Sequence, residues 1–410
     1  MKERKRQLSL HLEEKMNFRE NAYAIQNFLT DCRHHIHRNP ELSFKEWETT
    51  RFIVEKLTEM GIDVTTFEDY PGCIAHIGGK KPGRTVFLRA DIDALPMEEH
   101  SGVDYASNVP GVMHACGHDV HTTSLLGAAK LLKAVEDSIP GKVKLLFQSG
   151  EECFVGSQYY IKHHCFDSCD FIYGMHVWPG LEDGKVDFSD GNRMAACDNF
   201  VLKIHGKSAH GSTPNLGKDA IVCASAMIMN LQSIASRWND PMNPLVVSVG
   251  MIKAGTAFNI LCDEVELEGT VRTYDRDIHL AIDDAFRNVV ESTAKTYGCT
   301  VDIQYDKLEP AVVNDHAAEN EIARGAVAKL FGKDAVAYVD SGMGSEDFSQ
   351  IMEVVPGAFG FLGIRDEEYG AVWPLHSDHF RVNDNVLPIG AATYAQVAYD
   401  YLEAFAGEEE

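Results

Sequence analysis

The sequence contains no run of about 18 consecutive apolar residues, the length that a helix needs to cross a membrane. Its first residues are rich in Lys and Arg, but Glu13 and Glu14 follow them in place of the apolar core of a secretory signal. We therefore expect a cytoplasmic protein. Because the cytosol keeps thiols reduced, the ten cysteines are expected to be buried thiols or metal ligands and not a disulfide framework.

Positive charge is also scarce. Lys and Arg number 37 against 62 Asp and Glu, which leaves a formal net charge of −25. The phosphates of nucleic acids and of anionic membranes attract a basic surface, so neither is expected as a partner. A small acidic substrate would still need local cations, and arginines close to functional motifs are of interest for that reason.

The chain is long for a single hydrophobic core. Cores stop growing at roughly 250–300 residues, whereas this sequence has 410 residues, of which 45% are apolar and 24% charged. Short apolar runs alternate with helical patterns, which indicates an α/β fold with a mostly parallel sheet covered by helices. The apolar runs lie at 86–88, 143–147 and 171–175, and the helical patterns at about 46–60, 119–135, 319–331 and 386–405.

A different pattern occupies the segment 199–306. Strands are expected at 199–205, 245–252, 263–272 and 300–305, and helices at 217–237 and 277–297. Their β-α-β-β-α-β order is that of a ferredoxin-like α+β unit. The sequence thus predicts an N-terminal extension at 1–20, a discontinuous domain at 21–194 and 309–410, and an inserted domain at 195–308.

The most informative segment places Cys116, His118 and His121 within six residues at the start of an apolar helix. A structural zinc site would need a partner Cys-x-x-Cys or His-x-x-x-His pair elsewhere in the sequence, and there is none. Further ligands are expected at the ends of apolar runs, because the carboxyl ends of parallel strands gather at one edge of a sheet. These candidates are Glu151, Glu152, His176 and His376.

The combined set offers one thiolate, one carboxylate and three imidazoles. It is too large for one tetrahedral metal, but it suits two metal ions about 3.5–4 Å apart that share a bridging ligand. The predicted ligands are Cys116, His118, Glu152, His176 and His376. Glu151 is predicted to be the general base for a metal-activated water, which indicates a hydrolase. Adjacent glutamates taken alone are also typical of a solvated helix start.

Two aspartates, Asp91 and Asp93, end a strand beside the predicted site. Asp93 is predicted to hold the outer nitrogen of a ligand histidine, although aspartates at a strand end are also common turn formers. Asp119 is explained by capping of the helix N-terminus. His121 is open between a metal ligand and a hydrogen-bonded or surface histidine.

Eight motifs in a fixed order resemble those of the M20 metallopeptidase superfamily. The similarity is to its amidohydrolase branch, which contains hippurate hydrolases and auxin-conjugate hydrolases, and it extends over nearly the whole chain from about residue 30. The motifs lie at 34–43, 89–96, 113–119, 147–152, 176–179, 206–214, 343–348 and 375–377.

The resemblance implies the same dimetal ligands, with Cys116 as the bridging one and Glu151 as the general base. It also implies that the inserted domain is a lid and dimerisation domain, in which His210 reaches a neighbouring active site. Asn259 and Arg272 match residues that hold the substrate's free carboxylate, a role that suits the planar fork of Arg. By residue type alone, His210 is a surface loop histidine and Arg272 an exposed strand arginine.

Two pairs of residues depart from the pattern of this branch. Ser149 and Gly150 stand where Pro-Ala is usual, and Asp378 and His379 follow the histidine ligand where a Ser or Asn followed by Pro is commoner. Neither change removes a predicted ligand or base. We expect them to affect the shape of the pocket or the choice of substrate and metal.

The residues and the resemblance together predict a hydrolase with two divalent metal ions per chain. The resemblance implies that it is a homodimer or a higher homo-oligomer and that it cleaves the amide bond of N-acyl amino acids. Manganese or zinc is expected, and the mixed ligands also admit cobalt or nickel. One alternative is a dipeptidase or aminopeptidase with the same chemistry, which would need an acid to hold the substrate's amine. The other is a non-catalytic, metal-dependent binding protein.

Overall fold

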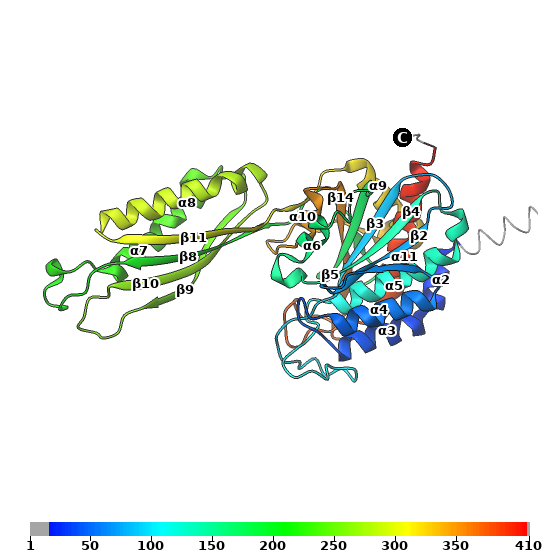
Figure 1. Ribbon diagram of the computed structural model, residues 1–410, viewed down its shortest axis with the longest axis horizontal. Coiled ribbons are helices and arrows are strands. Elements are labelled where there is room, and N and C mark those ends of the chain that lie inside the picture. The colour runs from blue at the N-terminus through cyan, green and yellow to red at the C-terminus, as the bar shows by residue number, and fades with distance from the viewer. Residues whose placement is uncertain (1–15, 408–410) are drawn as a thin grey trace, which may run out of the picture. The chain divides into compact units, whose positions relative to one another are not determined.

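The computed structural model describes residues 16–407, which divide into two compact units (Figure 1). The larger comprises the described residues up to Gly191, then Asn314–Asp340 and the residues from Gln350 onward. The smaller comprises Asn192–Val313 and Ser341–Ser349, a second segment that lies outside the insertion expected at 195–308. Of the N-terminal extension expected at 1–20, the first 15 residues lie outside the described part of the chain.

The larger unit is built on a sheet of eight strands in the order β1-β2-β4-β3-β5-β14-β6-β13. Its centre is parallel, from β4 through β3 and β5 to β14, whereas β1 and β2 pair antiparallel at one side. The strands are β1 (Asp63–Thr66), β2 (Gly72–Gly78), β3 (Thr85–Asp91), β4 (Lys142–Gln148), β5 (Phe171–Glu182), β6 (Val186–Asp187), β13 (Val336–Ala337) and β14 (Gly357–Arg365).

Burial explains the apolar character of the central strands. Every residue of β3 and the first seven of β5 are buried, as expected of parallel strands covered on both faces. The covering helices include α2 (Phe18–Ala24), α3 (Gln26–Arg38), α4 (Trp47–Glu59), α5 (His118–Ala134), α6 (Gly156–Lys162), α9 (Ala317–Phe331), α10 (Phe348–Met352) and α11 (Leu387–Ala404).

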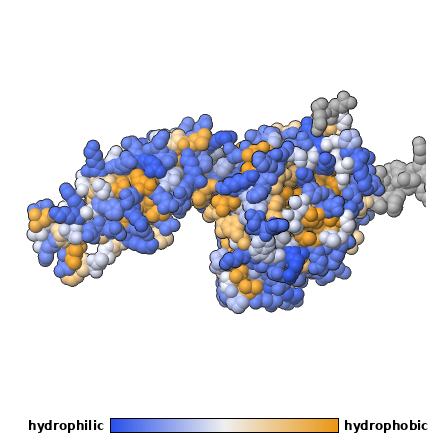
Figure 2. All heavy atoms as spheres, viewed as in Figure 1, coloured by the Kyte–Doolittle hydropathy of each residue, from blue (hydrophilic) through white to orange (hydrophobic). Residues whose placement is uncertain are grey.

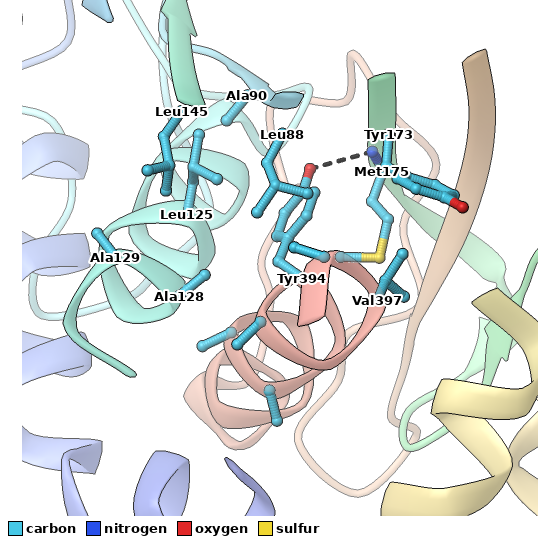
Figure 3. Packing of buried hydrophobic residues seen from close by; sticks show 14 of the residues in the cluster. Leu88, Ala90, Leu125, Ala128, Ala129, Leu145, Tyr173, Met175, Tyr394 and Val397 are labelled. Carbon is cyan, nitrogen blue, oxygen red and sulfur yellow. Dashed lines mark hydrogen bonds between the residues drawn. The ribbon is translucent and has the colours of Figure 1, made fainter. Parts of the chain in front are cut away.

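The helices α5 and α11 pack against each other and against β3 in the middle of the core. Figure 3 shows Leu88 and Ala90 of β3, Leu125 and Ala128 of α5 and Tyr394 of α11 in one cluster of buried side chains. Both helices are buried around most of their circumference, as helices enclosed by other elements are. The start of α5 is therefore fixed by packing along the whole helix.

The smaller unit has the predicted β-α-β-β-α-β order. Its sheet runs β11-β8-β10-β9 with antiparallel pairs, and α7 and α8 lie on the same face of it in Figure 1. Its own core includes Phe200, Leu267 and Phe286. The elements are β7 (Gly191–Met194), β8 (Ala196–His205), α7 (Ala220–Ser233), β9 (Leu245–Ala254), β10 (Glu264–Thr273), α8 (Arg276–Thr296), β11 (Thr300–Glu309) and β12 (Val312–Asn314).

The expected fold class is confirmed, and each predicted helix and strand has a counterpart. One prediction needs correction: the strand expected to stop at residue 175 continues to Glu182, because β5 goes on pairing with β14 after its pairing with β3 has ended. His176 therefore lies within a strand and not in the turn after it. Among residues 16–407, no helix is both long and apolar enough to span a lipid bilayer.

Candidate metal centre

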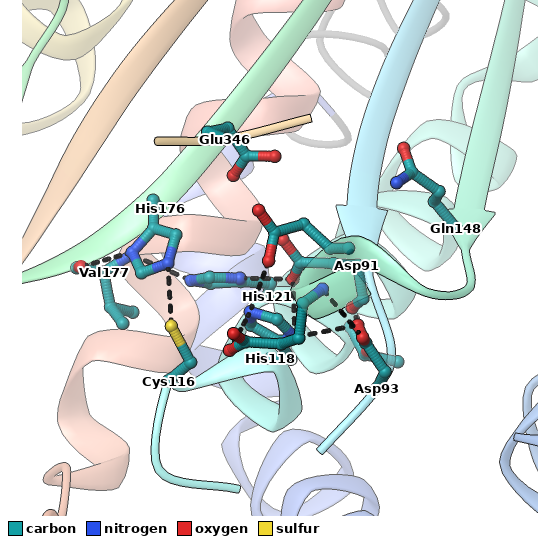
Figure 4. A network of polar contacts seen from close by, with 12 residues as sticks. Asp91, Asp93, Cys116, His118, His121, Gln148, His176, Val177 and Glu346 are labelled. Carbon is teal, nitrogen blue, oxygen red and sulfur yellow. Dashed lines mark hydrogen bonds and ion pairs between the residues drawn. The ribbon is translucent and has the colours of Figure 1, made fainter. Parts of the chain in front are cut away.

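The predicted ligands of the larger unit converge at the carboxyl ends of three parallel strands (Figure 4). Asp91 ends β3 and Asp93 follows it, and Glu151 begins a short 3-10 helix after β4. His176 lies on β5 beyond its last partner in β3. In an α/β sheet this edge is where ligands bind.

A left-handed turn presents Cys116 and His118 on either side of Gly117, which precedes the first turn of α5. Gly117 has a φ of 87°, and a Cβ atom there would lie 2.4 Å from Cγ2 of Val177. Any other residue would suffer both the strained backbone and this collision. The glycine thus allows α5 to approach β5 closely enough for Cys116 to meet His176.

Cys116 is common to two sets of potential metal ligands. One set is Cys116, His118 and His176, the other is Cys116, Glu152 and His376, and within each set the donor atoms lie within 4.8 Å of one another. The Cys116 Sγ is 3.4 Å from Nε2 of His176 and 3.3 Å from Nε2 of His376. This arrangement fits two metal ions with a bridging thiolate.

Buried polar atoms without hydrogen-bond partners also suit a site for metal ions. Among the described residues, the buried Nε2 of His118 and Oε1 of Glu152 have no hydrogen-bond partner, and they lie 3.9 Å apart. The Nδ1 of His176 donates to the carbonyl of Val177 over 2.7 Å, which leaves Nε2 with its lone pair toward Cys116. Buried polar atoms are costly unless paired, and a cation would satisfy them.

The charges around these residues also suit a cation. Burial lowers the pKa of His118, but the carboxylates of Asp91, Asp93 and Glu152 outweigh it and raise the pKa to about 10. Burial and the charges of Glu152 and Glu151 raise the pKa of the Cys116 thiol well above its ordinary value. Metal binding would displace the protons that these groups otherwise hold.

Asp93 connects the start of α5, which carries His118, with the 3-10 helix that carries Glu152. Its carboxylate accepts hydrogen bonds from Nδ1 of His118 at 3.2 Å, from the backbone N–H of Glu152 at 3.0 Å and from the Ser43 hydroxyl at 2.7 Å. Such a contact with the outer nitrogen fixes the tautomer of a ligand histidine, so that Nε2 of His118 faces the site.

Glu46 is a buried acid beside the site that sequence reasoning missed. The Ser149 hydroxyl and the Gly150 N–H both donate to its carboxylate, at 2.7 and 2.9 Å. Burial and then the charge of Asp93 raise the pKa of Glu46 to about 8. The unusual Ser149 thus holds the turn that precedes Glu151, a contact that the usual proline could not make with its side chain. The role of Glu46 depends on its contact with Ser149, which is far away in the sequence, so no local pattern could have predicted it.

His376 has a strained backbone and the most exposed side chain of the five ligands. Its φ of 62° lies in the left-handed region that residues other than glycine rarely adopt, and its N–H donates to the Ala115 carbonyl at 2.9 Å. The side chain is 53% exposed. Asp378 and His379, the pair that departs from the pattern of the branch, form an exposed cluster with His100. Asp378 pairs with His100 at 3.0 Å and with His379 at 2.7 Å. Strain of this kind is common at functional sites.

A second network holds the first turn of α5 and was also missed. The Asp119 carboxylate accepts from Nε of Arg33 at 3.0 Å and from Nδ1 of His37 at 2.8 Å. Burial lowers the pKa of His37, but Asp119 and Glu99 raise it to about 9. The expected capping role is wrong: Gly117 is the N-cap residue of α5 and no side chain caps the helix. Asp119 instead ties α5 to α3 next to His118.

The smaller unit carries His210, Asn259 and Arg272. His210 and Asn259 are neighbours on exposed loops, where the Gly211 N–H donates to the Asn259 carbonyl at 2.8 Å. Arg272 lies at the opposite end of β10, eight residues after Glu264 and so roughly 27 Å along the strand. Within one chain the structure brings His210 to Asn259 but not to Arg272.

His210 is oriented by the residue two positions later. The Ser212 N–H, which can only donate, lies 3.1 Å from Nδ1 of His210, and the Ser212 hydroxyl lies 2.7 Å from the same atom. Nδ1 is therefore an acceptor, and the proton of the neutral ring is on Nε2. That N–H is free to point at a substrate oxygen.

The fold and the site define the class of metal-dependent hydrolases that carry an inserted ferredoxin-like domain. The chain belongs to the peptidase family M20/M25/M40, whose model matches residues 87–400.

Its relatives within this class include proteins from bacteria and archaea. It is 36% identical to thermostable carboxypeptidase 2 of Saccharolobus solfataricus, over 92% of this chain and 96% of that one. It is 39% identical to N-acetyl-L-cysteine deacetylase of Bacillus subtilis, over 84% and 82%. A dinuclear metal-binding M20 peptidase of Bacillus subtilis has a similar structure, with a TM-score of 0.82, 32% identity, and coverage of 93% of this chain and 99% of that one.

Proposed function

We propose that this hydrolase cleaves the amide bond of N-acyl amino acids and releases a carboxylic acid and a free amino acid. The observation that carries the proposal is the position of Glu151. Its buried carboxylate lies 4.0 Å from Nε2 of His118, beside the two ligand sets. A carboxylate so close to metal ligands is suited to act as a general base.

Two divalent metal ions would be held by Cys116, His118, Glu152, His176 and His376. When bound, they would lower the pKa of a water molecule and polarise the scissile carbonyl. Manganese or zinc fits the mixed nitrogen, oxygen and sulfur donors, as do cobalt and nickel. Asp93 keeps His118 in the tautomer that this role requires.

The remaining steps fall to side chains of this chain. Glu151 takes a proton from the attacking water and later gives it to the nitrogen of the leaving amino acid. The Nε2–H of His210 donates to the carbonyl oxygen as negative charge develops there. Asn259 and Arg272 bind the free carboxylate of the substrate, which selects amino acids with an unblocked carboxyl end.

Peptides are the second candidate substrates, and a specific finding favours them: a relative of 36% identity is named a carboxypeptidase. A peptide and an N-acyl amino acid both end in a free carboxylate and share the same scissile bond. A dipeptidase or aminopeptidase would also need an acid near the substrate's amine, so activity on amine-blocked substrates excludes those two. A carboxypeptidase is distinguished instead by its rates on peptides relative to N-acyl amino acids.

Release of free amine from N-acetyl, N-benzoyl and N-indoleacetyl amino acids tests the proposal, with dipeptides assayed in parallel. The metal-loaded wild type is expected to release amine, whereas Glu151→Gln is expected to lose about 10²- to 10⁴-fold in kcat with both metals retained. Equal rates would remove Glu151 as the base. Activity on dipeptides alone would favour the peptidase, and no turnover with two metals bound would favour a binding protein.

We also propose that the chain works as a homodimer joined through the smaller unit, as the family resemblance implies. Its β9 is an edge strand, and apolar side chains of α7, β9 and nearby loops are exposed, including Met229, Ile252 and Phe258. Figure 2 shows apolar residues between polar ones over this unit. Arg272 lies far from His210 and Asn259 of the same chain, so the three cannot all contact one substrate within a chain. In a dimer, His210 and Asn259 could instead serve the site that contains the partner's Arg272.

Mixing two inactive variants tests this arrangement. In a dimer of Glu151→Gln with His210→Ala, one site has an intact Glu151 together with the partner's intact histidine. A 1:1 mixture after subunit exchange should therefore regain about a quarter of the wild-type activity, because half the dimers are mixed and half their sites intact. No gain in activity after confirmed exchange would show that His210 serves its own chain.

A further inference from the structure

The strands β3 and β5 part where the candidate metal centre lies. They pair in parallel from Val86 with Phe171 up to Arg89 with Gly174, and β5 then continues beside β14 alone. The β5 amides that follow Gly174 cannot pair with β3 in the normal ladder. Buried amide N–H groups need hydrogen-bond acceptors, so these amides must bond to groups outside β3.

Two side chains from two different helices bond these amides. The Tyr394 hydroxyl of α11 accepts from the Met175 N–H at 3.0 Å and donates to the Arg89 carbonyl at 2.7 Å (Figure 3). His121 of α5 accepts at Nε2 from the Val177 N–H, at 2.8 Å.

The other nitrogen of His121 completes the second bridge. Nδ1 donates to Oδ1 of Asp91 at 2.6 Å, and Arg89 holds the other oxygen of that carboxylate at 2.8 Å (Figure 4). Arg89 and Asp91 are two residues apart on β3, as are Met175 and Val177 on β5. Tyr394 and His121 therefore form successive rungs across the fork between the strands.

The second rung acts on Val177, the residue that follows the predicted metal ligand His176. Val177 gives its N–H to His121 and accepts the Nδ1–H of His176 at its carbonyl, so both imidazoles are tied to one residue. The rings of His121 and His176 lie 4.5 Å apart. Because an amide can only donate, Nε2 of His121 carries no proton and Nδ1 must be the donor to Asp91.

We infer that His121 is a positioning residue for His176 and that, with Tyr394 as the weaker rung, it controls the metal position formed by Cys116, His118 and His176. Both nitrogens of His121 are used within the protein, which argues against a ligand role although it lies near Asp91 and His118. The second position, formed by Cys116, Glu152 and His376, does not depend on the fork. The inference rests on the proposed ligand set.

The test is a titration of the metal-free protein with Co²⁺, followed by absorption, which reports both the number of ions bound and the thiolate-to-cobalt band. An asparagine amide can replace Nδ1 of His121 and keep the bond to Asp91, whereas a glutamine amide can replace Nε2 and keep the bond to Val177. His121→Asn is expected to weaken one of two Co²⁺ ions by about 10- to 100-fold. His121→Gln should restore most of that affinity, and Tyr394→Phe should weaken the same ion less.

Two reference variants separate the possible failures. His176→Ala should lose the same Co²⁺ ion. If it does while His121→Asn binds both ions like the wild type, the inference is overturned and the ligand set stands. If His176→Ala itself binds both ions normally, the ligand set fails and the inference fails with it. Equal weakening in the Asn and Gln variants would also overturn the route through Val177.

A control for general loss of stability comes from the smaller unit. His279 is buried there and its Nε2 lies 2.7 Å from Asp198, so His279→Asn removes a buried histidine–aspartate contact from the unit that contains none of the five predicted ligands. It should lower the melting temperature without changing Co²⁺ binding. If His121→Asn does not fold, Tyr394→Phe decides: weakened binding of one ion supports the inference, and wild-type binding overturns it.

Discussion

In the larger unit, Asp91, Asp93 and His118 are buried and hydrogen-bonded, whereas in the smaller unit His210 and Asn259 lie on exposed loops. Among the ligands, His118 and His176 are oriented by the protein itself, because Nδ1 of each has a protein partner. His210 is oriented only by its neighbour Ser212. One unit thus holds the candidate metal centre, and the other carries the residues that we propose to contact the substrate.

The difference assigns separate tasks to the two units. Metal ions with mixed nitrogen, oxygen and sulfur ligands require donors within a few tenths of an ångström of their ideal positions, which buried networks provide. In the proposed function, recognition of the substrate's carbonyl and carboxylate falls to groups on exposed loops, which can adjust to a bound molecule. Changes in the larger unit should therefore affect metal binding, and changes in the smaller unit should affect turnover with metal retained.

The largest expected effect comes from removing the shared thiolate. Cys116→Ala should lose high-affinity binding at both metal positions and with it all measurable activity, because both ligand sets contain this residue. Metal content after dialysis and activity on an N-acyl amino acid would measure the effect. Cys73→Ala removes an equally buried thiol from β2 and should keep both metals. Full metal content in Cys116→Ala would contradict the bridging role.

The next effect should appear in turnover alone. His210→Ala is expected to lower kcat by about 10²- to 10³-fold, the usual loss when one donor to a developing oxyanion is removed. Metal content should not change. His205→Ala, which removes a partly exposed histidine of the same unit, is the control and should retain its activity. A loss of metal from His210→Ala would break the division of tasks between the units.

Local patterns were enough to predict most of this architecture. The apolar runs and helical periods gave the α/β core and the β-α-β-β-α-β insertion, because burial on one or both faces dictates them. The ligand candidates followed from the rule that strand ends converge at one edge. These inferences need only residues close in sequence and one rule of topology.

The partners that hold the ligands could not be predicted in the same way. Glu46 bonds to Ser149 across 103 residues and Arg33 bonds to Asp119 across 86. His121 has a role only because β3 and β5 part at Arg89 and Gly174. Each of these contacts depends on tertiary distances, and the side chains concerned are otherwise typical of surfaces and helix ends.

The smallest of the three effects concerns the network that holds α5. The pKa of His37 is about 9 in the folded protein against an ordinary value of 6.5, because Asp119 and Glu99 outweigh the effect of burial. Because the folded protein binds the His37 proton more tightly than the unfolded chain, protonation of His37 stabilises the fold. This contribution is complete below pH 6.5 and disappears as the pH rises to about 9. Its size is on the order of 3 kcal/mol, which is a factor of roughly 10² in the folding equilibrium.

Denaturant unfolding of the metal-free protein between pH 6 and 9.5 measures this contribution as a difference between wild type and His37→Gln. The wild type should lose stability relative to the variant as the pH rises, since only the wild type releases the His37 proton over that range. His35→Gln, which changes an exposed histidine on the same helix whose pKa is lowered by burial and by Lys56, should leave the difference from wild type constant above pH 6.5. A His37→Gln curve parallel to the wild type would show that His37 is neutral in the fold, and the buried network would then hold α5 by neutral hydrogen bonds and the Arg33–Asp119 pair alone.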